Sequence, residues 1–117
     1  MAQTAPISIT AEMARGHRLR AHNLAAPLPP GAYVQTAAAC GLQNSPPAAF
    51  ETALFARVQG ASAAGIHRAL YEEKSLLQAW SFRGAPMVFP TADGAAFLSA
   101  LAAEGDEPWI YTRGIGL

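Results

Sequence analysis

The sequence predicts a single, mainly α-helical domain over residues 1–117 that carries one small antiparallel β-hairpin. Three observations support this fold class: a length of 117 residues, a composition that is 51% apolar and 14% charged, and a series of helix start and stop signals interrupted by one hairpin pattern. A chain of this length can bury roughly two thirds of its unfolded surface in one core. Its apolar and charged fractions are typical of a globular protein and not of a disordered chain.

The first predicted helix covers residues 10–22. Thr10 can serve as its N-cap, because a threonine oxygen accepts a hydrogen bond from an unpaired backbone N–H at a helix start. Glu12 then places a carboxylate in the first turn, where the helix dipole favours negative charge. The Pro-Pro-Gly sequence at residues 29–31 predicts a stiff connector after this helix.

Residues 32–74 are predicted to form the helical core of the domain. An alanine-rich helix begins near residue 32, and Gly41 can end it. The Ser-Pro-Pro sequence at residues 45–47 predicts the start of the next helix. Ser45 would be the N-cap, and both prolines would lie in the first turn, where their missing N–H groups cost nothing.

Apolar spacing defines the buried faces of this core. Phe50, Leu54 and Val58 recur at helical spacing, which predicts a helix that reaches Val58 and buries this stripe. Ser62 is the candidate N-cap of a further helix that runs to about residue 73.

Residues 75–90 are predicted to form the hairpin, with Gly84 in its turn. Proline cannot donate to a strand ladder, so Pro86 should confine the second strand, residues 87–89, to a sheet edge. Aromatic side chains of strands usually face the packed side of a sheet, and we therefore expect Trp80 and Phe82 in the core.

Two segments follow the hairpin. Residues 91–103 predict a last helix that Thr91 caps and whose inward face carries Phe97, Leu98 and Leu101. Residues 107–113 predict a strand, and a strand needs a partner. That partner could lie within the domain, in a second copy that residues 109–113 would join into a homodimer, or in a longer protein of which this chain is the front.

Three short helices followed by an edge hairpin and a final helix is the element order of a winged helix-turn-helix domain. In such domains the helix before the hairpin enters the major groove of DNA and the hairpin contacts the backbone. The formal net charge is zero, so the chain as a whole has no general attraction to nucleic acid. The charges are uneven, because residues 1–44 hold three arginines and one glutamate whereas residues 91–117 hold four acidic residues and one arginine.

The predicted helix before the hairpin offers a candidate DNA-binding face. His67, Tyr71 and Lys74 stand at helical spacing, with Arg68 beside them. Arginine and lysine suit phosphates or a guanine edge, and a tyrosine hydroxyl can donate to a phosphate. These four residues are therefore candidate contacts to double-stranded DNA.

Further arginines could extend this face. Arg83 lies at the predicted hairpin turn, and Arg15 and Arg18 lie on the first predicted helix. The alternative for the whole face is an ordinary solvated surface, which the neighbouring Glu72 and Glu73 would also fit.

Residues 41–47, 51–57 and 75–84 together resemble the AlkZ-like family of bacterial winged-helix DNA-binding proteins. The resemblance covers about residues 12–113 and includes a Trp-x-x-Arg-Gly pattern at residues 80–84. It implies longer proteins built from tandem winged helices, of which this chain would be the N-terminal part. For some members it also implies the removal of alkylated bases as DNA glycosylases.

The resemblance further implies a catalytic pair. Family glycosylases carry Gln-x-Gln or Gln-x-Asp where this chain has Gln43-Asn44-Ser45, so Gln43 matches the pattern and Ser45 departs from it. A glutamine amide cannot be a general base near neutral pH, but it can orient a water and stabilise a developing sugar cation. Such help suffices when the leaving base is already cationic. The alternative for residues 43–46 is a capped helix start without a catalytic role.

Composition disfavours several other functions. Cys40 is the only cysteine, and with three scattered histidines it lacks the spacing of metal ligands, so we expect neither a metal nor a cofactor. No apolar run approaches the ~20 residues needed to cross a bilayer, which predicts a cytoplasmic protein without a membrane partner. Three functions are left: a DNA-binding module, a DNA glycosylase for alkylated bases, and a protein-interaction fragment that dimerises and binds no DNA.

Overall fold

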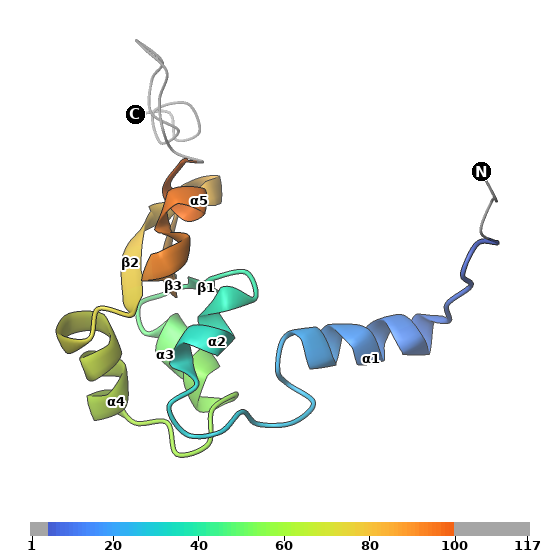
Figure 1. Cartoon of the computed structure of the whole chain (residues 1–117), viewed down its shortest axis with the longest axis horizontal. Coiled ribbons are helices and arrows are strands. Elements are labelled where there is room, and N and C mark those ends of the chain that lie inside the picture. The colour runs from blue at the N-terminus through green and yellow to red at the C-terminus, as the bar shows by residue number, and fades with distance from the viewer. Residues whose placement is uncertain (1–4, 100–117) are drawn as a thin grey trace, which may run out of the picture.

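The computed structural model of the chain describes residues 5–99. Its elements are α1 (Ala11–Ala21), α2 (Tyr33–Ala38), β1 (Leu42–Gln43), α3 (Ala49–Phe55), α4 (Ala63–His67), a π-helical turn (Arg68–Glu72, called the π-turn below), β2 (Leu76–Ser81), β3 (Ala85–Pro90) and α5 (Gly94–Ser99). Short 3-10 turns join β2 to β3 (Phe82–Gly84) and β3 to α5 (Thr91–Asp93). The described part of the chain is therefore a mixed α/β fold with five α-helices and one three-stranded antiparallel sheet (Figure 1).

The predicted first helix is confirmed as α1. Thr10 caps it, because its Oγ1 accepts a hydrogen bond from the backbone N–H of Met13 at 3.1 Å. No residue of α1 is buried, and Figure 1 shows α1 extending away from the other elements. The segment after α1 is held to the body where Arg57 Nε donates to the carbonyl oxygen of His22 at 2.8 Å.

The hydrophobic core lies between the sheet and helices α2, α3 and α4. All three strands and all three helices contribute to it, and its buried members are Tyr33, Ala37, Leu42, Phe50, Leu54, Val58, Ile66, Ala69, Leu76 and Val88. Burying one large aliphatic or aromatic side chain stabilises a fold by about 1.5–3 kcal/mol. The predicted stripe of Phe50, Leu54 and Val58 is thus confirmed as buried.

The sheet order is β1-β3-β2, so β3 is the central strand and not the edge strand that Pro86 predicts. Leu42 pairs with Val88 and Gln43 with Met87, while Trp80 on β2 pairs with Pro86. The carbonyl oxygen of Pro86 accepts from the backbone N–H of Asn44 at 2.8 Å, on the β1 side. The backbone N and O of one residue in an antiparallel strand point to the same neighbouring strand. Pro86 therefore lacks an N–H on the β1 side, and no hydrogen bond between β3 and β2 is lost.

The start and end of the second core helix differ from the prediction. Ser45 is not its N-cap: α3 begins at Ala49, and its N-cap is Ala48, whose φ of 71° is left-handed. The two prolines instead belong to the preceding turn, which the bond from Ala49 N–H to the carbonyl oxygen of Pro46 closes at 3.1 Å. The helix also ends at Phe55, and Val58 forms an isolated parallel bridge with Leu28.

The aromatic residues of the hairpin are more exposed than predicted. Trp80 is 45% exposed and Phe82 38%, whereas Ser81 is fully buried. Ser81 takes the position under α5 because its Oγ donates to the carbonyl oxygen of Phe97 at 2.6 Å. In β2, the first and last residues, Leu76 and Ser81, are buried, so burial does not alternate strictly along the strand.

The segment after the hairpin also departs from the prediction in part. Thr91 does not cap a helix by accepting a bond; its Oγ1 donates to the carbonyl oxygen of Lys74 at 2.6 Å. Phe97 packs inward as expected and stacks on Phe89 with ring centroids 4.5 Å apart, but Leu98 is 42% exposed. Leu101 and the predicted strand at residues 107–113 lie outside the described residues.

We predict opposite effects of a methyl group at two glycines. A Cβ at Gly65 would collide with the hydroxyl of Tyr33, which accepts from the backbone N–H of Ser62 at 3.2 Å, so Gly65→Ala should lower the free energy of unfolding by about 1–3 kcal/mol. Nothing lies within 4 Å of a Cβ at Gly94, so Gly94→Ala should stabilise by about 0.4–1 kcal/mol. Urea unfolding would measure both, and equal midpoints would contradict this packing.

Candidate nucleic-acid interface

A cleft of about 320 Å³ opens between the turn after β1, helix α3, helix α4 with the π-turn, and strand β2. Its polar lining consists of Asn44, Glu51, His67, Tyr71 and Gln78, and its apolar lining includes Phe50, Ile66 and Leu70. Residues from four separate parts of the chain thus meet around one hollow.

Asn44 lies at the inner side of this cleft. Its backbone N–H extends the β1–β3 ladder by one bond to Pro86, which fixes its position. Its side-chain Oδ1 is buried and has no hydrogen-bond partner among the described residues. Gln43 and Ser45 are both exposed and do not line the cleft, as expected when side chains alternate along an extended segment.

Glu51 supplies the carboxylate of the cleft from the first turn of α3. The residue is half-buried, and its side chain makes no hydrogen bond or ion pair with any other residue in the described range. Asn44 Oδ1 and the Glu51 carboxylate are both hydrogen-bond acceptors. Of these two acceptors, the Glu51 carboxylate is partly exposed to the cleft, whereas Asn44 Oδ1 is buried beneath its surface.

His67 and Tyr71 form the aromatic wall of the cleft. Their ring centroids are 4.9 Å apart, and Tyr71 is 64% exposed. A second hollow of about 370 Å³ shares Leu70, Tyr71 and Gln78 with the cleft and continues along Leu76 and Leu77. Tyr71 thus stands between two hollows that share one wall.

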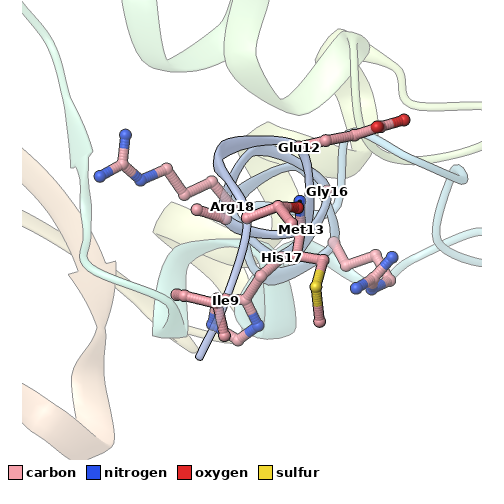
Figure 2. A pocket seen from close by; sticks show the side chains of 9 residues that line it. Ile9, Glu12, Met13, Gly16, His17 and Arg18 are labelled. Carbon is pink, nitrogen blue, oxygen red and sulfur yellow. The ribbon is translucent and has the colours of Figure 1, made fainter. Parts of the chain in front are cut away.

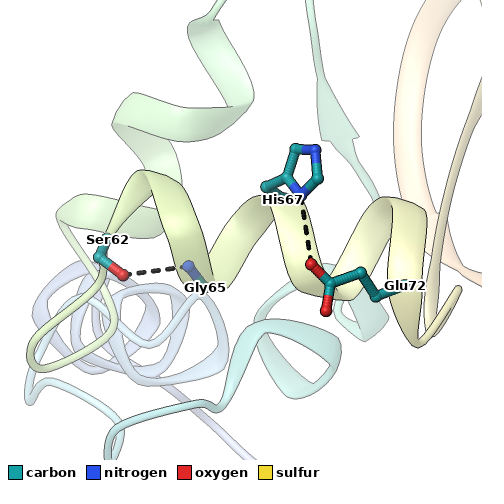
Figure 3. Close-up of polar contacts among 4 residues, drawn as sticks. All are labelled: Ser62, Gly65, His67 and Glu72. Atoms are coloured by element: carbon teal, nitrogen blue, oxygen red, sulfur yellow. Dashed lines mark hydrogen bonds and ion pairs between the residues drawn. The ribbon is translucent and has the colours of Figure 1, made fainter.

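The π-turn shapes the predicted DNA-binding face. It closes with a bond from the backbone N–H of Glu73 to the carbonyl oxygen of Arg68 at 2.8 Å, five residues apart. The wider turn also brings the Glu72 carboxylate within 3.7 Å of His67 Nδ1 (Figure 3). This pair attracts only when His67 is protonated, and with both side chains 63% exposed it contributes little to stability.

The structure brings some of the predicted contacts together and separates others. His67, Arg68 and Tyr71 are exposed on consecutive turns of one helical segment. Lys74 is exposed just beyond its end, with a left-handed φ of 54°, and so leaves the helical stripe. Arg83 belongs to the turn Phe82–Gly84 that follows β2, roughly 20 Å from Lys74 for six strand residues at ~3.3 Å each.

Arg15 and Arg18 are exposed on α1, apart from the cleft. A hollow of about 810 Å³ lies along this helix, but only residues from Ile9 to Arg20 line it. Figure 2 shows Ile9, Met13 and His17 on one side of α1 and Glu12 on the other. One helix and its lead-in cannot enclose a ligand, so this hollow is an open surface.

Among residues 5–99, no group of three histidine, cysteine or acidic side chains is arranged to hold a metal ion. The same part of the chain has no helix that is long and apolar enough to span a membrane. Cys40 is a free, exposed cysteine.

Sequence reasoning did not find Asn44, Glu51 or Gln78 as site residues. Asn44 carried one usable signal, since it stands between two predicted catalytic residues in an extended segment and must face the other way. Glu51 directly follows the buried Phe50, so only the packing of α3 against α4 tells whether its side chain meets solvent or a cleft. Gln78 on β2 carried no local signal.

We predict that removing the buried acceptor stabilises the protein. Asn44→Leu keeps the side-chain size but eliminates an unpaired buried oxygen, so the free energy of unfolding should rise by about 1 kcal/mol. The control Gln43→Leu alters an exposed neighbour and should change it by less than about 0.5 kcal/mol. Chemical denaturation measures both, and a clear loss of stability in Asn44→Leu would show that Oδ1 is satisfied within the fold.

The family model described as DNA glycosylase AlkZ-like matches residues 36–115, which include the cleft, the π-turn and the hairpin. No curated protein and no solved structure matches the chain. Because the matched range covers more than half of its residues, the chain belongs to the DNA glycosylase AlkZ-like family.

Proposed function

We propose that the chain is a winged-helix module that binds double-stranded DNA. The observation that carries this proposal is the match to a DNA glycosylase family over the segment that holds α4, the π-turn and the hairpin. A DNA-binding or DNA-repair role follows from that family. The order of α2, α3 and α4 followed by β2 and β3 supports the winged-helix arrangement, in which α4 would enter the major groove.

The exposed side chains of the π-turn side would make the contacts. Arg68 and Lys74 would bind phosphates, and the hydroxyl of Tyr71 would donate to another. Arg83 in the turn after β2 would contact the DNA backbone about 20 Å farther along. The protruding α1 would bring Arg15 and Arg18 to flanking phosphates. We propose a cytoplasmic location for this DNA-binding protein.

Glu72 weakens this face, because its carboxylate lies beside His67 and repels phosphate. Each phosphate that a cation neutralises adds about 0.9 to the slope of log affinity against log salt, so binding weakens as the salt concentration rises. We therefore expect useful affinity only at low ionic strength for this chain alone.

The proposal predicts that Arg68→Gln and Lys74→Gln each weaken duplex binding several-fold and lower the salt slope by about 0.9. Fluorescence anisotropy at two salt concentrations measures both quantities. Arg20→Gln, which removes the same charge from the last turn of α1, is the control and should have a smaller effect. Equal effects of all three variants would mean that DNA binding depends on net charge alone. The absence of any binding at low salt would contradict the proposed function.

A DNA glycosylase is the second candidate. It is favoured by the placement of Gln43 on β1, where the pairing with Met87 holds the residue and leaves its side chain exposed for a nucleotide and a water. Ser45 is also exposed, but its shorter side chain departs from the family pattern. Base extrusion costs a few kcal/mol, which a single neutral domain must recover from its DNA contacts.

If this second candidate holds, the chain should release methylated purines from alkylated duplex DNA, and Gln43→Ala should abolish that release. Chromatography of the freed bases is the measurement. Gln35→Ala, at an exposed glutamine of α2, should leave the release unchanged. Release that survives Gln43→Ala would argue against the assigned role of this amide.

A further inference from the structure

We propose that Thr91 is a positioning residue for DNA binding, because its hydroxyl fixes the backbone of Lys74 in the conformation that presents this cation to a phosphate. The inference rests on the proposed DNA-binding function and deepens it, since it names the side chain that sets the place of one assigned contact. Thr91 belongs to the turn after β3 and bonds to Lys74 from a position 17 residues farther along the chain.

The backbone of Lys74 is strained. This residue directly follows Glu73, the C-cap of the π-turn, and has a left-handed φ of 54°. Glycine or asparagine usually occupies such a position after a helix, because the Cβ of other residues crowds the carbonyl oxygen. Among residues 5–99, three non-glycine residues have a positive φ, and Lys74 is the charged one. Strain of this kind persists only where surrounding contacts enforce it, and it is often found at functional sites.

Thr91 supplies such contacts on the side that follows Lys74. Its Oγ1 donates to the carbonyl oxygen of Lys74 at 2.6 Å, which restricts the ψ angle of that residue. Its backbone N–H donates to the carbonyl oxygen of Ser75 at 3.0 Å and extends the β2–β3 ladder beyond the pair of Leu76 and Pro90. Thr91 therefore bonds to two successive carbonyl groups at the corner between the π-turn and β2.

The side that precedes Lys74 is fixed by the π-turn. The backbone N–H of Glu73 donates to the carbonyl oxygen of Arg68 at 2.8 Å. The hydroxyl of Ser75 also reaches back to this turn, where it donates to the carbonyl oxygen of Ala69 at 3.4 Å. The residues on both sides of Lys74 are thus bonded to regular elements, and the corner itself depends on the torsion angles of Lys74.

A fixed corner matters because a lysine side chain is long and flexible. Its ammonium group lies at the end of a four-carbon stem, so the backbone sets the region of space that the charge can reach. Lys74 is exposed, and within residues 5–99 the Thr91 hydroxyl is the side-chain group that bonds to its backbone. Without this bond the corner could relax toward an unstrained conformation, and DNA binding would then carry the cost of ordering it again.

A double-mutant cycle tests the inference, with fluorescence anisotropy of a labelled duplex at two salt concentrations as the measurement. Thr91→Val keeps the shape of the side chain and removes its donor, so it should weaken binding several-fold and lower the salt slope by up to about 0.9. The double variant with Lys74→Gln should bind no more weakly than Lys74→Gln alone, because Thr91 acts through Lys74.

Two control variants should bind like the wild type. Thr91→Ser retains the hydroxyl donor. Ser99→Ala removes a similar bond elsewhere, from a hydroxyl to the carbonyl oxygen of Ala96 in α5 at 3.1 Å. Thr91 is exposed, so the fold should survive its substitution, and urea unfolding of every variant checks that each is folded under the binding conditions.

The outcomes separate this inference from the function on which it rests. Full affinity in Thr91→Val or in Lys74→Gln, or a Thr91→Val loss that is equally large in the Lys74→Gln background, would overturn the inference and leave DNA binding standing. A wild-type chain that binds no duplex at low salt would overturn the function and the inference together.

Discussion

The pairing of β1 with the central strand β3 positions the rest of the candidate site. β1 contributes only Leu42 and Gln43 to the sheet, yet this short ladder buries Leu42 in the core and turns Gln43 outward. One further bond, from Asn44 to Pro86, carries the alternation forward by a residue and directs the amide of Asn44 toward α4. Gln43 is thereby exposed to solvent, whereas Asn44 lines the cleft.

The π-turn after α4 is the second feature that the site depends on. An α-helical continuation would place side chains four residues apart in register, whereas the wider turn brings residues five apart together, as in the pair of His67 and Glu72. The turn keeps Tyr71 at the cleft while it ends the helix before Lys74. Turns of this kind are often found at functional sites, which agrees with the position of this one between the cleft and the exposed cations.

Local features of the fold could be predicted from the sequence, and tertiary ones could not. The caps at Thr10 and Ser62 and the hairpin over residues 76–90 follow from residues that are neighbours in the chain. The central place of β3 escaped prediction, because a two-residue strand has no sequence pattern and Pro86 favours an edge. Helical spacing placed His67 and Tyr71 on one exposed side but also Lys74, which leaves the helix, while the place of Asn44 and Glu51 at the cleft depends on how α3 packs beside α4.

Amide chemical-shift mapping of the isotope-labelled chain during titration with a short duplex tests the central claim most directly. DNA gripped from the π-turn side should shift the signals of residues 67–74 and of Gly84, with smaller changes in α2. Shifts confined to α1, or an unchanged spectrum at low salt, would contradict the account.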